Sequence, residues 1–231
     1  MPRLVVLTGA GISAESGLGT FRDKGGLWTR HDLSDVATPE GFARNPSRVH
    51  DFYNARRANA AQASPNPAHL ALARLGAALG DDLLLVTQNV DDLHERAGSC
   101  DVVHMHGALR DACCAGCGHG WAAPLVMRAT DPCPACAARL TRPDIVWFGE
   151  IPQHMDSILA ALRVCDDFVA IGTSGTVYPA AGFVAEAAAN GARTLELNLE
   201  PSAVVSDFDA SRFGPASRIV PDWVAEVMRG A

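Results

Sequence analysis

Residues 4–14 read Leu4-Val5-Val6-Leu7-Thr8-Gly9-Ala10-Gly11-Ile12-Ser13-Ala14, an apolar run followed by a glycine-rich turn. The apolar run before Gly9 is typical of a strand covered on both faces, as the strands of a parallel sheet are. Gly9, Gly11 and Ala14 then fit the GxGxxG/A pattern, in which small residues allow a tight turn, close approach of a pyrophosphate and packing of the next helix. We therefore expect an α/β protein with a Rossmann-like parallel sheet. A glycine-rich turn without a ligand is the alternative.

The region about twenty residues further on departs from the usual dinucleotide pattern. An oxidoreductase places an acidic residue there, after a second strand, to hold the adenosine ribose. Residues 19–28 are instead rich in glycine, carry Phe21 and Arg22, and predict a loop. Such a loop can close over a cofactor and exclude water, or it can be a plain surface loop. The missing acid indicates that the dinucleotide does not serve ordinary hydride transfer.

Polar side chains follow the next predicted strand, which runs from Leu83 to Thr87. Asn89 and Asp91 come directly after it, and His106-Gly107 follows within twenty residues of Gln88. An amide and a carboxylate can hold a ribose or a water, and a neutral imidazole can take a proton near pH 7. Gly107 would let the backbone turn tightly beside the imidazole. The stretch predicts a general base, with a structural histidine as the alternative.

Five of the seven cysteines lie between Cys113 and Cys136. The pairs Cys114-Ala115-Gly116-Cys117 and Cys133-Pro134-Ala135-Cys136 are separated by fifteen residues, a spacing that suits four thiolates around a structural zinc ion. Cys113 adjoins Cys114, but the two-residue gap favours Cys114 as the ligand. Free or disulfide-paired cysteines are the alternative. Without a secretion signal, clustered thiols indicate a reducing, cytoplasmic compartment.

Composition narrows the function classes. The chain has 231 residues, 48% of them hydrophobic, which suits one sizeable domain with a small insertion. Its formal net charge is −7 and it has no basic block, which argues against sequence-independent nucleic-acid binding. No apolar run approaches the length of a membrane span. We expect a protein that binds neither nucleic acid nor membrane.

A helix is predicted from about Pro46 to Gln62, with Asn45 as its N-cap and proline at the first helical position. Tyr53 and Arg56 lie three residues apart and therefore share a face of this helix. Together they can bind a carboxylate, the guanidinium by a fork and the phenol by its hydroxyl. The alternative is that Tyr53 packs in the core and Arg56 is solvated.

Two later strands also end in small polar loops. Phe168–Ile171 leads into Gly172-Thr173-Ser174, and Thr194–Leu197 leads into Asn198-Leu199-Glu200. Such loops suit contacts to phosphate or ribose at the edge of a sheet. The aromatic stretch Asp144–Glu150 can pair its backbone with an extended peptide, or it can be an ordinary buried strand end.

These motifs together resemble the sirtuins, the NAD-dependent protein deacylases. Tyr53 and Arg56 match the pair that marks the class III branch, which prefers acidic acyl groups such as succinyl and malonyl. Thr20 and Val90 depart from the family, which usually has aspartate and isoleucine there. The matching motifs, in the family's order, are Gly9-Ala10-Gly11-Ile12-Ser13, Phe21-Arg22, Gln88-Asn89-Val90-Asp91, His106-Gly107, the two cysteine pairs, Trp147-Phe148-Gly149-Glu150, Gly172-Thr173-Ser174 and Asn198-Leu199-Glu200.

The resemblance implies that NAD is a co-substrate, cleaved rather than reduced. The carbonyl oxygen of an acyl-lysine attacks C1′ of the nicotinamide ribose and nicotinamide leaves. His106 then acts as general base on the ribose hydroxyls, and water completes release of free lysine and O-acyl-ADP-ribose. Asn89 and Asp91 position ribose and water, and Phe21 shields the reactive intermediate. Arg56 pairs with the distal carboxylate of the acyl group.

The resemblance also implies the site residues. The catalytic set is His106, Asn89 and Asp91. The cofactor-binding set is Gly9, Ala10, Gly11, Ser13, Glu15, Thr20, Phe21, Arg22, Trp28, Gln88, Asn89, Val90, Asp91, Gly172, Thr173, Ser174, Asn198, Leu199, Glu200 and Ala216. The substrate-binding set is Tyr53, Arg56, Val146, Trp147, Phe148 and Gly149, and the zinc ligands are Cys114, Cys117, Cys133 and Cys136.

We expect a single catalytic unit over residues 1–231. Its Rossmann-like part takes residues 1–30, 64–112 and 143–231, its small helical part takes 31–63, and its zinc ribbon takes 113–142. The expected activity is removal of acetyl, succinyl and malonyl groups from protein lysines by a monomer. The alternatives are a mono-ADP-ribosyltransferase, which shares the first chemical step, and a non-catalytic NAD-binding module. The latter would not need a general base.

Overall fold

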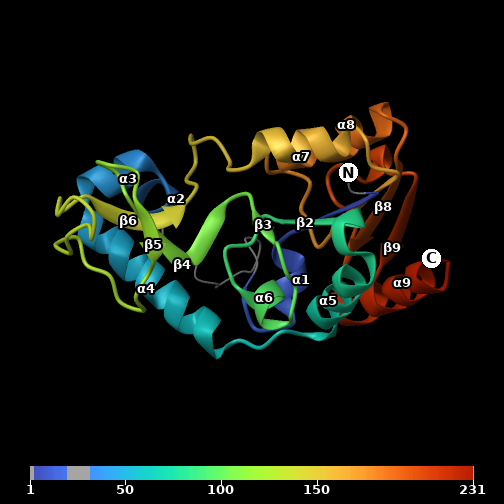
Figure 1. Cartoon of the computed structure of the whole chain (residues 1–231), viewed down its shortest axis with the longest axis horizontal. Helices are drawn as coiled ribbons and strands as arrows, with labels where there is room; N and C mark the ends of the chain where they lie inside the picture. Colours follow the sequence, from blue (N-terminus) through green and yellow to red (C-terminus); the bar gives the residue numbers. More distant parts are fainter. Residues whose placement is uncertain (1–2, 20–31, 231) are drawn as a thin grey trace.

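The computed structural model describes residues 3–19 and 32–230. Four predicted cofactor-binding residues, Thr20, Phe21, Arg22 and Trp28, therefore lie outside the described residues. The described chain forms one parallel sheet covered by helices and a smaller antiparallel module beside it (Figure 1).

The large sheet has six parallel strands in the order β3-β2-β1-β7-β8-β9. The predicted first strand is β1, Leu4–Thr8, and it lies between β2 and β7 in the middle of the sheet. The other strands are β2 (Leu83–Thr87), β3 (Val103–His104), β7 (Asp167–Ile171), β8 (Arg193–Asn198) and β9 (Ala210–Phe213). This arrangement confirms the expected Rossmann-like fold.

Helices cover both faces of the sheet because its side chains are apolar on both. In β1, Val5 and Leu7 pack into the core cluster on one face, while Leu4 and Val6 pack into the cluster on the other. Burying each such side chain contributes about 1.5–3 kcal/mol. The first face is covered by α7 (Met155–Leu162), η3 (Ala180–Gly182) and α8 (Phe183–Ala189), and the second by α1 (Ala10–Ala14), α5 (Pro67–Leu79) and α9 (Ala216–Gly230) (Figure 1).

The small module joins an antiparallel sheet to a group of helices. Its three strands are β5 (Gly120–Ala122), β4 (Gly107–Cys114) and β6 (Thr141–Ile145), in that order across the sheet. The helices α2 (Leu33–Val36), α3 (Pro39–Arg44) and α4 (Pro46–Gln62) pack beside it, at the left of Figure 1. Strand β4 crosses the predicted boundary between residues 112 and 113, so this sheet starts before the predicted ribbon. The division into domains stays a prediction.

Two helix starts follow the capping chemistry of the sequence. Asn45 accepts a hydrogen bond from the Arg48 amide at the start of α4, and Pro46 takes the first helical position. Asn66 caps α5 in the same way, and the His69 ring accepts from the Asn66 amide in return. The helix predicted over 46–62 is confirmed.

The elements around the later strands are short. Helix α6 takes only Leu93–Arg96, because the Asp91 carboxylate accepts from the Leu93 amide and holds the preceding residues outside the helix. Strand β3 has only two residues, Val103–His104. After β7 the chain forms the 3₁₀ turn η3 and becomes α-helical at Phe183.

The closing helix, α9, begins at Ala216. The Glu15 carboxylate accepts hydrogen bonds from the Ser217 amide at 2.8 Å and from its hydroxyl at 2.7 Å. This distant carboxylate satisfies an amide of the first helical turn. Pro221 lies inside the helix, where it has no N–H to donate to the helix ladder.

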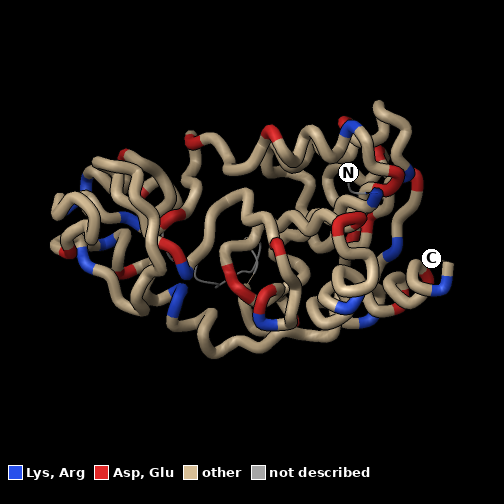
Figure 2. The backbone as a smooth tube through the Cα atoms, viewed as in Figure 1, with Lys and Arg blue, Asp and Glu red and all other residues tan. Residues whose placement is uncertain are grey.

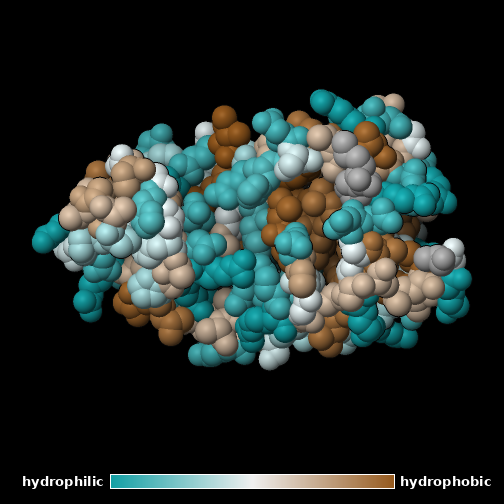
Figure 3. All heavy atoms as spheres, in the orientation of Figure 1, coloured by the Kyte–Doolittle hydropathy of each residue, from teal (hydrophilic) through white to brown (hydrophobic). Residues whose placement is uncertain are grey.

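Arg residues are interspersed with Asp and Glu residues along the described part of the chain (Figure 2). Figure 3 shows an apolar patch at the upper edge, over the loop between β6 and α7, where Phe148 and Ile151 are exposed. Within residues 3–19 and 32–230, every helix is too short or too polar to cross a bilayer.

Candidate active site

The carboxyl ends of four parallel strands bring the predicted motifs together. Gly9 donates from its amide to Ile171 at 2.9 Å, and Gln88 donates to Thr8 at 2.9 Å. Gly172 donates in turn to Leu197 at 2.9 Å. After β1 the chain forms β2 and β3 on one side of β1, and it later forms β7, β8 and β9 on the other side. The topological switch point therefore lies between β1 and β7. Ligands of α/β sheets bind at this position.

The turn after β1 and the loop after β7 approach each other so closely that only glycine leaves enough space between them. A methyl group on Gly11 would lie 2.7 Å from the Gly172 Cα, and one on Gly9 would lie 2.8 Å from the Gly172 carbonyl oxygen. Gly172 itself has φ of +64°, a conformation that favours glycine. The pattern thus also serves packing between the turn after β1 and the loop after β7.

His106 is oriented by the loop that follows β2. Its Nδ1 lies 3.1 Å from the Gln88 carbonyl oxygen. A carbonyl only accepts, so Nδ1 carries the proton and Nε2 keeps a lone pair. Burial lowers the pKa of His106, although the bond to Gln88 acts in the opposite direction. The imidazole is therefore neutral at pH 7 and has one nitrogen available to accept a proton.

Gly107 explains why the backbone can turn directly after this imidazole. Its φ is +76°, and a methyl group there would overlap the carbonyl oxygen of Asp144. The Val146 amide donates to the His106 carbonyl at 3.0 Å, which joins the aromatic stretch 146–149 to the same point. His106 is thus held on one side by the Gln88 loop and on the other by the small module.

Asn89 and Asp91 meet at Ser13. The Asn89 amide donates to the Gly9 carbonyl and to the Ser13 hydroxyl, each at 3.1 Å, and Ser13 donates to Asp91 at 3.2 Å. Burial raises the pKa of Asp91, while hydrogen bonds from the Leu93 amide and Ser13 lower it. These bonds tie the loop after β2 to the turn after β1.

Three further histidines lie near this site, and none of them was among the predicted site residues. His69 lies 3.5 Å from the Ser13 hydroxyl, and His94 lies 2.9 Å from the hydroxyl of Thr8. Burial lowers the pKa of His69 to about 4 and that of His94 to about 3, so both rings are neutral. His104 bridges the Asn89 carbonyl at 3.1 Å and the Glu95 carboxylate at 2.7 Å. His104 was within the stretch that supplied His106, but no motif marks the other two.

Tyr53 and Arg56 lie together on α4. The Arg56 guanidinium carbon is 5.7 Å from the centre of the Tyr53 ring. Tyr53 is buried in a cluster with Trp147, and Val90 of the Gln88 loop packs against this cluster. Burial lowers the pKa of Arg56, and the charge of Asp91 raises it. The helix face thus borders the loop that carries the predicted catalytic residues. Tyr53 does pack in the core, as the alternative held, but beside a half-buried arginine.

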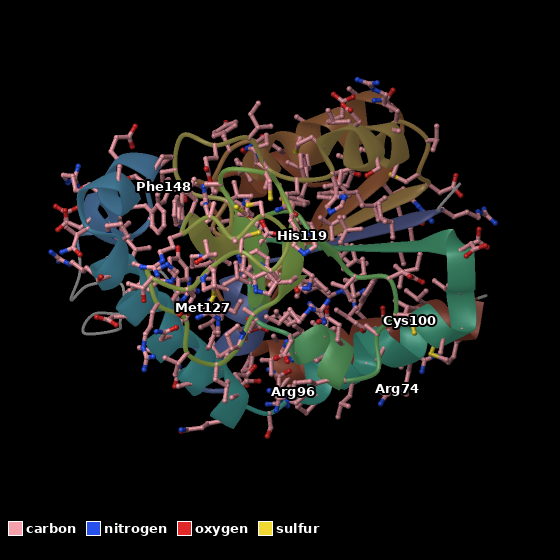
Figure 4. All side chains as sticks on the ribbon, turned by 60° about the vertical axis from the view of Figure 1, so that its left-hand side comes forward. Arg74, Arg96, Cys100, His119, Met127 and Phe148 are labelled. Carbon is pink, nitrogen blue, oxygen red and sulfur yellow. The ribbon has the colours of Figure 1, made fainter. Side chains whose placement is uncertain are left out.

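The remaining predicted site residues fall at the same edge or beside it. The side-chain amide of Asn198 donates to the Thr173 carbonyl oxygen at 2.7 Å, which joins the loops after β7 and β8. Leu199 and Glu200 are exposed, whereas the Glu15 carboxylate is bound to Ser217 beside Ala216. Phe148 and Gly149 are exposed at the loop after β6, and the Phe148 amide donates to the Ala37 carbonyl near α2 (Figure 4).

The four cysteine sulfurs form a cluster that fits zinc. The Sγ atoms of Cys114, Cys117, Cys133 and Cys136 all lie within 4.8 Å of one another. The Cys114–Cys136 and Cys117–Cys133 separations are 3.7 and 3.8 Å. Tetrahedral zinc with 2.3 Å bonds to sulfur separates its ligand atoms by about 3.8 Å. The donor set is therefore complete without water, as in a structural site, and Cys114 rather than Cys113 belongs to it.

The fold and the site define the class: an α/β protein of the dinucleotide-binding type with a four-cysteine module. The Sir2 family model matches residues 9–179. A protein of Caulobacter vibrioides named NAD-dependent protein deacylase is 58% identical over 230 residues, covering 98% of this chain and 97% of that protein. The chain belongs to the Sir2 family, which confirms the resemblance to the sirtuins.

Solved structures agree with this assignment. A mutant Sir2 homologue in complex with ADP-ribose has a TM-score of 0.90 and 37% identity, with 98% of this chain and 92% of that chain covered. A Sir2 homologue in complex with NAD has a TM-score of 0.89 and 38% identity, with coverage of 98% and 90%. These similarities extend over both the large sheet and the small module.

Proposed function

We propose that the protein is an NAD-dependent protein-lysine deacylase that releases nicotinamide, O-acyl-ADP-ribose and free lysine. The observation that carries this proposal is the state of His106, a neutral imidazole whose Nδ1–H is bound to Gln88 and whose Nε2 can accept a proton. A protein that only binds a dinucleotide has no need of such a base. The 58% identical relative that is named a deacylase supports the reaction class.

NAD supplies the electrophilic ribose carbon and the hydroxyl groups to which the acyl group is transferred. The turn Gly9–Ser13 is proposed to lie against its pyrophosphate, because this turn follows β1 at the switch point of the sheet. Asn89 and Asp91 are proposed to orient the ribose and a water, because Ser13 fixes both side chains. His106 is proposed to take the proton of a ribose hydroxyl at Nε2. Zinc would be held by the four cysteines and would act structurally.

The acyl group is proposed to be acidic, with succinyl and malonyl preferred over acetyl. Tyr53 and Arg56 support this preference, since a phenol and a guanidinium side by side suit a carboxylate. Partial burial of Arg56 strengthens such a pairing, because fewer waters compete for the charge.

Replacing Arg56 with methionine tests the acyl preference. We expect Arg56→Met to lower kcat/KM for a succinyl-lysine peptide about 10- to 100-fold, the 1.5–3 kcal/mol of a hydrogen bond to a charged group. The same peptide with butyryl-lysine is the control, because butyryl carries a methyl group in place of the succinyl carboxylate. Its kcat/KM should change by no more than about threefold, since methionine preserves most of the side-chain volume.

Equal losses on the succinyl and butyryl peptides would show that Arg56 does not bind the acyl carboxylate. The deacylase assignment would survive that result. A selective loss would direct the search for cellular substrates to proteins with acidic lysine modifications.

Cytoplasmic location and a monomeric state are proposed as well. None of the seven cysteines forms a disulfide bond, which suits a reducing compartment. The partners are acylated proteins, since the reaction acts on lysine side chains of other chains.

A further inference from the structure

Trp147 contacts the predicted acyl site through a hydrogen bond. Its indole Nε1 donates to the Tyr53 hydroxyl oxygen at 2.9 Å, across 94 residues of sequence. Both side chains are almost completely buried, with 3% and 1% of their surface exposed. Trp147 belongs to the stretch predicted to bind a peptide, but its indole reaches the phenol of Tyr53 on α4 instead of the surface.

Three interactions hold this indole. The Arg142 guanidinium carbon lies 3.5 Å from the centre of the indole ring, so the cation stacks on it. Arg142 is bound at both ends of the Glu150 carboxylate, at 2.7 and 2.9 Å. Glu150 also accepts from the Trp147 amide at 2.8 Å. Phe42 packs against the ring with centroids 5.2 Å apart. These contacts hold the Trp147 side chain by the faces of its ring and the Trp147 backbone by its amide.

The bond from Trp147 limits what the Tyr53 hydroxyl group can do with its own proton. A phenol has one proton to donate and accepts through its oxygen. The indole nitrogen is a donor only, and so is the guanidinium of Arg56. Neither neighbour can take the phenolic proton, which is thereby directed toward an acceptor from outside the pair. The carboxylate of an acidic acyl group is such an acceptor.

We propose that Trp147, clamped by Arg142 and Glu150, is a specificity-determining positioning residue: it fixes the Tyr53 hydroxyl so that its proton is directed to the carboxylate of the acyl group. This inference rests on the proposed preference for acidic acyl groups. Trp147 acts through Tyr53 and does not itself touch the carboxylate.

The test is a double-mutant cycle of Trp147→Phe and Tyr53→Phe, read as the ratio of kcat/KM for succinyl- over butyryl-lysine in one peptide sequence. A general loss of peptide binding lowers both values alike and cancels in the ratio. We expect Trp147→Phe to lower the ratio about fivefold in the native background, the size of one hydrogen bond. In the Tyr53→Phe background it should lower the ratio by less than about twofold, because the shared bond is already gone.

An unchanged ratio in Trp147→Phe, or the same fall in both backgrounds, would overturn the inference. Arg142→Lys provides a second variant that leaves the indole in place; it keeps the charge but loses the planar stacking, and should lower the ratio about two- to threefold only when Tyr53 is present. A native protein with an Arg56-dependent ratio that Trp147→Phe leaves intact would overturn this inference alone. A native protein without any preference for succinyl over butyryl would overturn both this inference and the proposed acyl preference.

Discussion

Replacing His106 with alanine is expected to lower kcat/KM for acyl removal about 100- to 10,000-fold, the usual contribution of a general base. His106 is the neutral imidazole whose Nε2 is left free by the bond from Nδ1 to Gln88. Its removal takes away the acceptor for the ribose proton but leaves the turn after β1 and the loop after β7 unchanged. NAD should therefore still bind with a dissociation constant within about threefold of the native value.

The measurement pairs steady-state kinetics on an acyl-lysine peptide with calorimetric titration of NAD. His154→Asn is the matched control, because His154 is exposed and in the left-handed conformation that asparagine tolerates. The control should keep activity within about twofold. Substantial acyl removal by His106→Ala would refute the assignment of the base, and lost NAD binding would show that His106 has another role.

Removal of one zinc ligand, by Cys133→Ser, is expected to abolish metal binding and activity together. Apparent zinc-binding free energies of about 10–16 kcal/mol are comparable to the whole stability of a domain, so the module should not stay folded without the metal. Strand β4 runs from Gly107, next to His106, to the ligand Cys114. Loss of the module therefore displaces one side of the predicted base.

The measurement is zinc content by elemental analysis, together with thermal unfolding. Native protein should hold about one zinc per chain, as four thiolates require. Cys100→Ser is the control, since Cys100 is an exposed thiol outside the cluster. It should keep the metal, the unfolding temperature and the activity. A Cys133→Ser variant that keeps full zinc content and activity would show that these sulfurs do not form the site.

Local chemistry predicted much of the fold. The strand before Gly9 and the cap at Asn45 depend on neighbouring residues, so both could be read from the sequence. The four cysteines needed only their spacing. The strand Gly107–Cys114 escaped prediction because its sequence GALRDACC does not alternate between apolar and polar residues. The small sheet is therefore specified by the pairing of its strands and not by the sequence pattern of β4 alone.

Long-range contacts account for what the sequence did not reveal about the site. The bond between Trp147 and Tyr53 joins residues 94 positions apart, and the bond between Glu15 and Ser217 joins residues 202 apart. No periodicity marks either pair. His69 is likewise brought to Ser13 by the packing of α5. Such partners depend on topology, so they become visible only when the sheet and its helices are assembled.

We expect the protein to transfer an acyl group from lysine to the ADP-ribose part of NAD. Mass spectrometry of the products formed from NAD and one peptide that carries acetyl-, malonyl- or succinyl-lysine tests this transfer. Nicotinamide, free-lysine peptide and O-acyl-ADP-ribose should form in equal amounts, and fastest from an acidic acyl group. ADP-ribose attached to protein without regard to acylation, or no turnover by protein that holds zinc and NAD, would contradict this expectation.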